Sequence, residues 1–191
     1  MKNISLLLLT LLISTPLLAQ YDYDLSNSFP FGKLNPEAFP QTADYALLIG
    51  ISECKSESRA QDGSWNEEVD MIWRWKYIMN GMAVQDETLK ADGLHSGSIR
   101  QFNADSTKWH VHYYSSSAAT SSLSSWEGEP KKDGSIVLYR RQPAPNGTDG
   151  YYRLTYSEIT KKGFNWIGEW VNLEETFSYP TWKISCKKIA S

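Results

Sequence analysis

Two histidines on one face of a short predicted strand are the first residues whose spacing suggests chemistry. His110 and His112 lie two residues apart in KWHVHYY, a spacing that can bring two imidazoles to one metal ion. The third histidine, His95, stands in the turn-rich stretch DGLHSGS. The sequence near the pair offers no obvious third ligand. We therefore favour surface histidines and predict no metal, haem or other cofactor.

Arg100 and Arg153 are the candidates for charged groups inside the fold. Arg100 shares a strand face with Phe102, and Arg153 lies within YYRLTY. A buried guanidinium needs a carboxylate or several carbonyls to offset its desolvation. Each arginine could bind a ligand carboxylate or phosphate through its planar fork, or pair with Glu169 or Asp86 and hold strands together. We favour the structural role and keep ligand binding as the alternative.

Catalytic motifs are missing from the sequence. It contains no G-x-S-x-G elbow, no H-E-x-x-H and no P-loop. The serines between Ser115 and Ser125 are typical of polar strand or loop positions. A carboxylate pair could come from six acidic residues that also fit a solvated surface: Glu67, Glu68, Asp86, Glu169, Glu174 and Glu175. We predict no catalytic residue. An isomerase- or hydrolase-like enzyme using Arg100, Arg153 and His112 is the alternative.

Aromatic residues alternate along the segment DMIWRWKYIMNGMAVQD, residues 70–86. In a strand, successive side chains point to opposite faces, so Trp73, Trp75 and Tyr77 share one face. The same alternation recurs in KWHVHYY and FNWIGEW. Such rings line an interior, which either packs solid or holds a small apolar or amphiphilic ligand. The candidate ligand-binding residues are Trp73, Trp75, Arg100, Trp109, Tyr113, Arg153 and Trp166.

Short β-like runs separated by turn signals must position these side chains. Asn80-Gly81, Asp92-Gly93 and Asp133-Gly134 are typical hairpin turns. No window of a dozen residues has a helical period, although residues 36–48 allow one short helix. The sequence predicts an all-β fold: a single antiparallel β-barrel of about nine or ten strands, with a sandwich as the alternative.

The first 19 residues predict a secretory signal peptide. Lys2 precedes the apolar run from Ile4 to Ile13, and Ala19 offers a small residue for cleavage. Residues 20–44 contain three prolines and are expected to form an extended segment that either packs on the barrel or is a structureless tail. Residues 45–191 are expected to form the barrel domain. The protein is therefore expected to be exported, periplasmic or secreted, with no membrane span after cleavage.

The net charge and the two cysteines limit the possible partners and predict a covalent cross-link. A net charge of −3 argues against nucleic acid as a partner. Cys54 and Cys186 lie near the two ends of the folded region, so closure of a barrel would bring their strands together. We predict a disulfide between them; free buried thiols are the alternative, and a two-cysteine metal site fits less well. The oligomeric state is left open.

From Leu48 onward the chain resembles bacterial lipocalin-like (calycin-like) β-barrel proteins of unassigned function. The resemblance rests on the ordered segments WRWKYIMNGMAVQD, IRQFN with KWHVHYY, and YYRLTYSEITKKGFNW with TWKISC. It implies the barrel fold and export, and no established activity. Residues 177–180, Phe-Ser-Tyr-Pro, depart from the acidic, glycine-containing turn expected there, so a different shape is expected for the last hairpin.

Three hypotheses follow. The first is an exported protein that binds a small apolar or amphiphilic molecule; the second is an enzyme using the same cavity; the third is a filled-barrel structural or interaction domain. A continuous cavity with a converging polar group favours the first two. A histidine or carboxylate within hydrogen-bond reach of an arginine in that cavity favours the enzyme. A barrel packed shut by its tryptophans favours the third.

Overall fold

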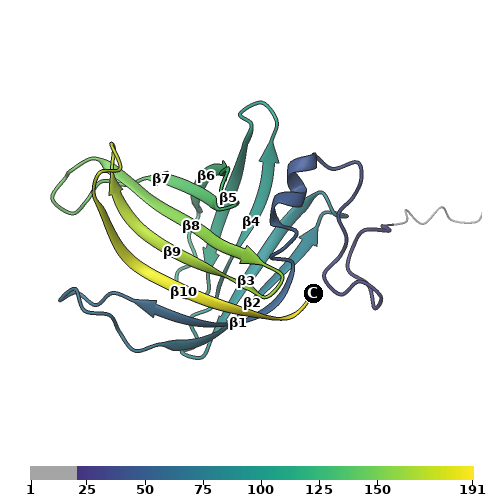
Figure 1. The fold of residues 1–191 in the computed structure, drawn as a ribbon, viewed down its shortest axis with the longest axis horizontal. Coiled ribbons are helices and arrows are strands. Elements are labelled where there is room, and N and C mark those ends of the chain that lie inside the picture. Colours follow the sequence, from purple (N-terminus) through teal and green to yellow (C-terminus); the bar gives the residue numbers. More distant parts are fainter. Residues whose placement is uncertain (1–20) are drawn as a thin grey trace, which may run out of the picture.

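The computed structural model describes residues 21–191, so the predicted signal peptide lies outside the described residues. Ten strands and one short 3₁₀ helix make up this part of the chain (Figure 1). Within residues 21–191, no helix is long and apolar enough to cross a membrane. In chain order the elements are η1 (Pro40–Tyr45), β1 (Gly50–Ser58), β2 (Val69–Ile78), β3 (Ala83–Lys90), β4 (Ser96–Asn103), β5 (Lys108–Ser115), β6 (Ser124–Pro130), β7 (Ile136–Arg141), β8 (Gly150–Thr160), β9 (Gly163–Asn172) and β10 (Ser178–Ala190).

The strands form one closed antiparallel barrel. Each strand pairs with its neighbours in sequence, and β1 pairs with β10 to complete the ring. Closure leaves none of these ten strands as an edge strand with a row of unpaired backbone groups. The predicted single antiparallel barrel of about nine or ten strands is therefore confirmed. Its architecture is compatible with a lipocalin-like fold.

The alternating sequence pattern sets which face of each strand points inward. Along β2, Met71, Trp73 and Trp75 are buried, whereas Asp70 and Arg74 are exposed. Side chains on one face of the strand contact water and those on the other face pack in the core, so burial alternates from one residue to the next. The predicted aromatic interior face of this strand is confirmed.

The segment before β1 closes one end of the barrel. In Figure 1 this segment and η1, in purple, lie at the end near the C-terminus. The Phe31 carbonyl accepts a hydrogen bond from Tyr77 N at 2.9 Å. Gly81 has a positive φ of 80° and fits tightly here, because a Cβ on it would lie 2.3 Å from the Lys33 carbonyl oxygen. Leu48, just before β1, is fully buried. This end is therefore covered by packed chain.

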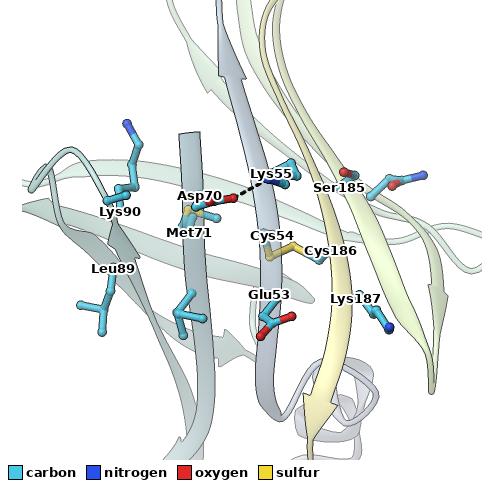
Figure 2. A pocket seen from close by; sticks show the side chains of 13 residues that line it. Glu53, Cys54, Lys55, Asp70, Met71, Leu89, Lys90, Ser185, Cys186 and Lys187 are labelled. Atoms are coloured by element: carbon cyan, nitrogen blue, oxygen red, sulfur yellow. Dashed lines mark hydrogen bonds and ion pairs between the residues drawn. A yellow bond between two sulfur atoms is a disulfide. The ribbon is translucent and has the colours of Figure 1, made fainter. Parts of the chain in front are cut away.

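A disulfide between Cys54 and Cys186 joins the first and last strands, as predicted (Figure 2). The two residues are direct partners in the β1–β10 ladder, at a sequence separation of 132. Cross-linking so long a loop restricts the unfolded chain and thereby stabilises the folded one. The bond thus reinforces the pairing that closes the barrel.

Replacing both cysteines in a C54S/C186S variant should lower the free energy of unfolding by about 2–4 kcal/mol, because the unfolded chain regains its loop entropy. Urea unfolding of the oxidised wild type and of the double variant measures this difference. The reduced wild type is the matched control and should behave like the variant. A loss below about 1 kcal/mol would show that strand pairing alone closes the barrel.

Candidate functional site

A cavity of about 370 Å³ occupies the half of the barrel opposite the N-terminal segment. Inward side chains from all strands except β1 line it. At its outer end, Ser96, Tyr113, Ser124 and Gln142 are only partly buried and lie at or beside the strand ends farthest from η1. The cavity therefore has a mouth at this end of the barrel and a floor near its middle.

A buried ion pair forms the floor. Asp86 on β3 and Arg100 on β4 are 3% and 1% exposed, and Arg100 Nη1 donates a hydrogen bond to Asp86 Oδ1. Trp73 Nε1 donates to Asp86 Oδ2 at 2.7 Å, and Ser98 Oγ donates to Asp86 Oδ1 at 2.9 Å. Three donors thus compensate the carboxylate for its loss of water.

The guanidinium of Arg100 connects the floor to the packed half of the barrel. Arg100 Nη2 donates to the Tyr156 hydroxyl at 2.8 Å. Its central carbon lies 4.3 Å from the ring centroid of Trp75 and 5.3 Å from that of Tyr45. A desolvated cation over aromatic faces is stabilised by their quadrupoles. Arg100 therefore joins β3, β8, β2 and the N-terminal segment.

Burial and the ion pair shift the pKa values of the groups on the floor. Burial disfavours the charged form of Arg100, but Asp86, Tyr156 and Tyr45 together outweigh this effect and raise the pKa of Arg100. Burial raises the pKa of Tyr156 to about 12, against the opposing effect of Arg100. Burial likewise raises the pKa of Tyr45. Both tyrosines are thus held neutral beside a fixed cation.

Beneath the floor the interior is filled. The Tyr45 ring stacks on Trp75 at 5.7 Å and meets Trp109 edge-on at 4.8 Å between centroids. Trp109 Nε1 donates to Asp44 Oδ2 at 3.0 Å. Trp75 and Trp109 are fully buried and do not line the cavity. These two candidate residues form the core on which the cavity rests.

Of the other candidate residues, Trp73, Arg100, Tyr113 and Trp166 line the cavity, and Arg153 does not. Arg153 lies on the outer face of β8, because Tyr152 and Leu154 on either side point inward. It pairs with Glu169 at 2.9 Å and with Glu175. Both arginines thus form the strand-joining pairs that we favoured, Arg153 with Glu169 and Arg100 with Asp86.

The cavity residues absent from the sequence-based set include Trp126, Arg140, Tyr152 and Trp182. Arg140 is the charged residue among these four. Ile136 and Leu138 on β7 are buried in the core, so alternation places Arg140 on the same inward face. The guanidinium carbon of Arg140 lies 4.4 Å from the Trp126 ring centroid.

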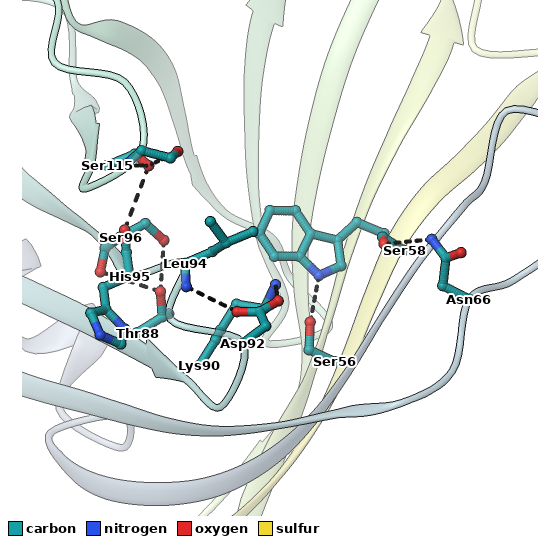
Figure 3. A network of polar contacts seen from close by, with 12 residues as sticks. Ser56, Ser58, Asn66, Thr88, Lys90, Asp92, Leu94, His95, Ser96 and Ser115 are labelled. Carbon is teal, nitrogen blue, oxygen red and sulfur yellow. Dashed lines mark hydrogen bonds and ion pairs between the residues drawn. The ribbon is translucent and has the colours of Figure 1, made fainter.

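Hydrogen bonds hold the side chains at the mouth in place. Trp182 Nε1 donates to Ser56 Oγ at 2.8 Å, and the hydroxyls of Thr88 and Ser96 lie 2.6 Å apart (Figure 3). These contacts join β10 to β1 and β3 to β4. They fix the rotamers of groups that line the cavity, so the mouth is shaped before any ligand arrives.

The histidines lie outside the cavity. His110 and His112 are on the outer face of β5, opposite Trp109 and Val111 in the alternation. His112 Nδ1 lies 2.8 Å from Ser125 Oγ on the neighbouring strand. Within residues 21–191, no group of three or more potential ligands among His, Cys, Asp and Glu is placed to hold a metal ion.

A larger hollow of about 840 Å³ lies on the outer surface around the disulfide (Figure 2). Its lining includes several exposed side chains, and two of them, Lys55 and Asp70, pair with each other at 2.6 Å. No buried polar group other than the disulfide-bonded Cys54 is among its lining residues. The smaller interior cavity is therefore the better candidate site, because its polar groups converge in a desolvated space.

Comparison with known proteins gives no independent assignment. A scan against protein-family models matched no family, and a search of curated proteins found no match.

Replacing one partner of the buried pair should destabilise the barrel strongly. In D86N the guanidinium of Arg100 loses its counter-charge, and the free energy of unfolding should fall by about 3–5 kcal/mol. Urea unfolding measures the loss. The double variant D86L/R100M is the control, since it removes both charges and should be more stable than D86N. Equal losses in the two variants would contradict a coupled pair.

Stability should fall as the pH rises from about 10 to about 12. Unfolding returns Tyr156 from a pKa of about 12 to its ordinary value of 10.0, so the unfolded chain releases a proton that the folded chain keeps. The stabilisation is complete below pH 10 and is lost at about 1.4 kcal/mol per pH unit for this tyrosine. Urea unfolding at several pH values should give a shallower slope for Y156F than for the wild type. Identical slopes would contradict the assignment.

Proposed function

We propose that this protein is an exported lipocalin-like barrel that binds a small apolar or amphiphilic molecule inside its cavity. The observation that carries the proposal is the cavity of about 370 Å³ inside the barrel, with polar groups that converge on it. Cavities of about 300–1,000 Å³ are usual for small-molecule sites. A barrel filled by its tryptophans is less consistent with this cavity.

The dimensions and lining of the cavity limit the ligand. At about 30 Å³ for each water molecule, the cavity of about 370 Å³ holds on the order of a dozen water-sized groups. Trp73, Trp126, Trp166 and Trp182 give it apolar walls, while serine, threonine, tyrosine and arginine groups supply hydrogen bonds. This lining suits a compact amphiphile better than a lipid with two long chains.

Export is supported by two features. The first 19 residues have the composition of a secretory signal peptide. Cys54 and Cys186 form a disulfide, and such bonds persist mainly in oxidising compartments such as the periplasm or the extracellular medium. Together they support a site of action outside the cytosol.

An enzyme that uses the same cavity is the second candidate function. It is favoured by the carboxylate of Asp86 in the cavity wall, within hydrogen-bond reach of Arg100. However, both oxygens of Asp86 already accept hydrogen bonds, from Trp73 at one oxygen and from Ser98 and Arg100 at the other. A general base needs a free acceptor facing its substrate. Binding therefore accounts for the site better than catalysis.

Blocking the mouth tests the proposal. Ser124 lines the cavity, whereas its neighbour Ser125 is exposed on the outer face of β6. The S124W ring should occupy the mouth and weaken binding by about tenfold or more, while S125W should bind as the wild type does. Isothermal titration calorimetry with a panel of short-chain and aromatic acids and alcohols measures the affinities. Equal weakening in both variants, or no binding to the wild type, would contradict the proposal.

A further inference from the structure

The charges in the cavity wall do not balance. Three charged side chains line it: Asp86, Arg100 and Arg140. Asp86 and Arg100 neutralise each other on the floor. The charge of Arg140 is not balanced by another lining residue. The cavity wall therefore carries one net positive charge, although the whole chain has a net charge of −3. Such a local excess favours an anion in that space.

Arg140 differs from its neighbours along the chain in lacking a counter-ion. Arg141, on the outer face, pairs with Asp149 at 3.0 Å, and Arg153 pairs with Glu169 at 2.9 Å. Among the residues that the structure describes, no carboxylate pairs with Arg140. A guanidinium in a partly desolvated position without an anion is costly to maintain. Its placement therefore requires another explanation.

The remaining contacts of Arg140 orient its guanidinium and leave donors free. The guanidinium lies over the Trp126 ring, 4.4 Å from its centroid, and Nη2 donates to Gln142 Oε1. Trp126 is itself held by a hydrogen bond from Nε1 to the Tyr152 carbonyl at 3.1 Å. One of the five N–H donors of a guanidinium is thus used within the described residues. The side chain is preorganised for a second, planar acceptor.

Burial at this position also disfavours the protonated, charged form of Arg140. The surrounding protein lowers the pKa of Arg140, and the nearby Tyr152 only partly opposes this effect. Arginine nevertheless stays charged at neutral pH. An anion beside it would offset the desolvation that causes the shift.

The position along the barrel axis sets how a ligand would lie. Arg140 and Gln142 are at the mouth end, near the β7–β8 loop, whereas Trp73, Tyr156 and Trp166 lie deeper in the cavity. A molecule with one charged end and an apolar body would match this arrangement with its charge toward the mouth. One guanidinium balances one negative charge, and its fork fits the two oxygens of a carboxylate.

We propose that Arg140 is the anion-binding residue of this cavity and that the ligand is a small amphiphilic monocarboxylate. Its carboxylate binds Arg140 at the mouth, and its apolar body lies against the tryptophans below. This inference rests on the proposed function, because it names the class of ligand for the same cavity.

Matched probes and a matched variant separate the two proposals. The probes are 2-naphthoate and decanoate, each compared with its alcohol, 2-naphthalenemethanol or 1-decanol. The variants are R140Q and R141Q, which remove the same charge from adjacent residues that face into the cavity and out to solvent. Calorimetry gives the affinities, and urea unfolding shows whether each variant is folded. R140K keeps the charge and removes the planar fork.

The wild type should bind at least one acid about tenfold more tightly than its alcohol. R140Q should lose that preference while its affinity for the alcohol stays the same, R140K should keep part of it, and R141Q should match the wild type. Equal affinity of acid and alcohol in the wild type, or a preference that survives in folded R140Q, would overturn the role of Arg140 and leave the cavity proposal standing. Failure of all four probes to bind the wild type would overturn both. If R140Q does not fold, the role of Arg140 is decided by the difference in affinity between acid and alcohol in the wild type and by its change in R140K.

Discussion

The buried ion pair between Asp86 and Arg100 is the interaction on which the division of the barrel interior depends. Arg100 is 1% exposed, donates to Tyr156 at 2.8 Å and stacks on Trp75 at 4.3 Å. On one side of the pair, Tyr45 from the N-terminal segment completes an aromatic core. On the other side, the strands themselves and Gln142 beside β7 line the cavity, and a ring of ten strands is wider than its own side chains fill. The protein is therefore a barrel closed at one end and hollow at the other.

Most of the fold could be predicted from local patterns. Alternation in WRWKYIM fixed the inward face of β2, and turn pairs such as Asn80-Gly81 marked the hairpins. The disulfide between Cys54 and Cys186 followed from closure of the ring. How the N-terminal segment packs could not be derived in this way. Its contacts with the barrel join residues far apart in sequence, such as Phe31 with Tyr77, and no local period encodes them.

The candidate site was predictable only in part, for a related reason. Trp75 and Trp109 have the same strand pattern as Trp73, but Tyr45 packs against the first two and makes them core. Sequence alternation identifies the inward face, and it does not show how deep along the barrel the filling reaches. In β7 the run Ile136-Val137-Leu138 is buried throughout, which hides the alternation that places Arg140 inside. The residue that gives the cavity its charge was therefore missed.

The most direct test of a hollow, ligand-binding barrel is native mass spectrometry of the protein purified from the organism that produces it. The spectrum would be recorded under native conditions and again after denaturation. We expect a discrete additional mass that disappears on denaturation and corresponds to a single small molecule of a size that fits a cavity of about 370 Å³. A native spectrum that shows only the bare chain would contradict the account, and the cavity would then be a packing feature of the barrel.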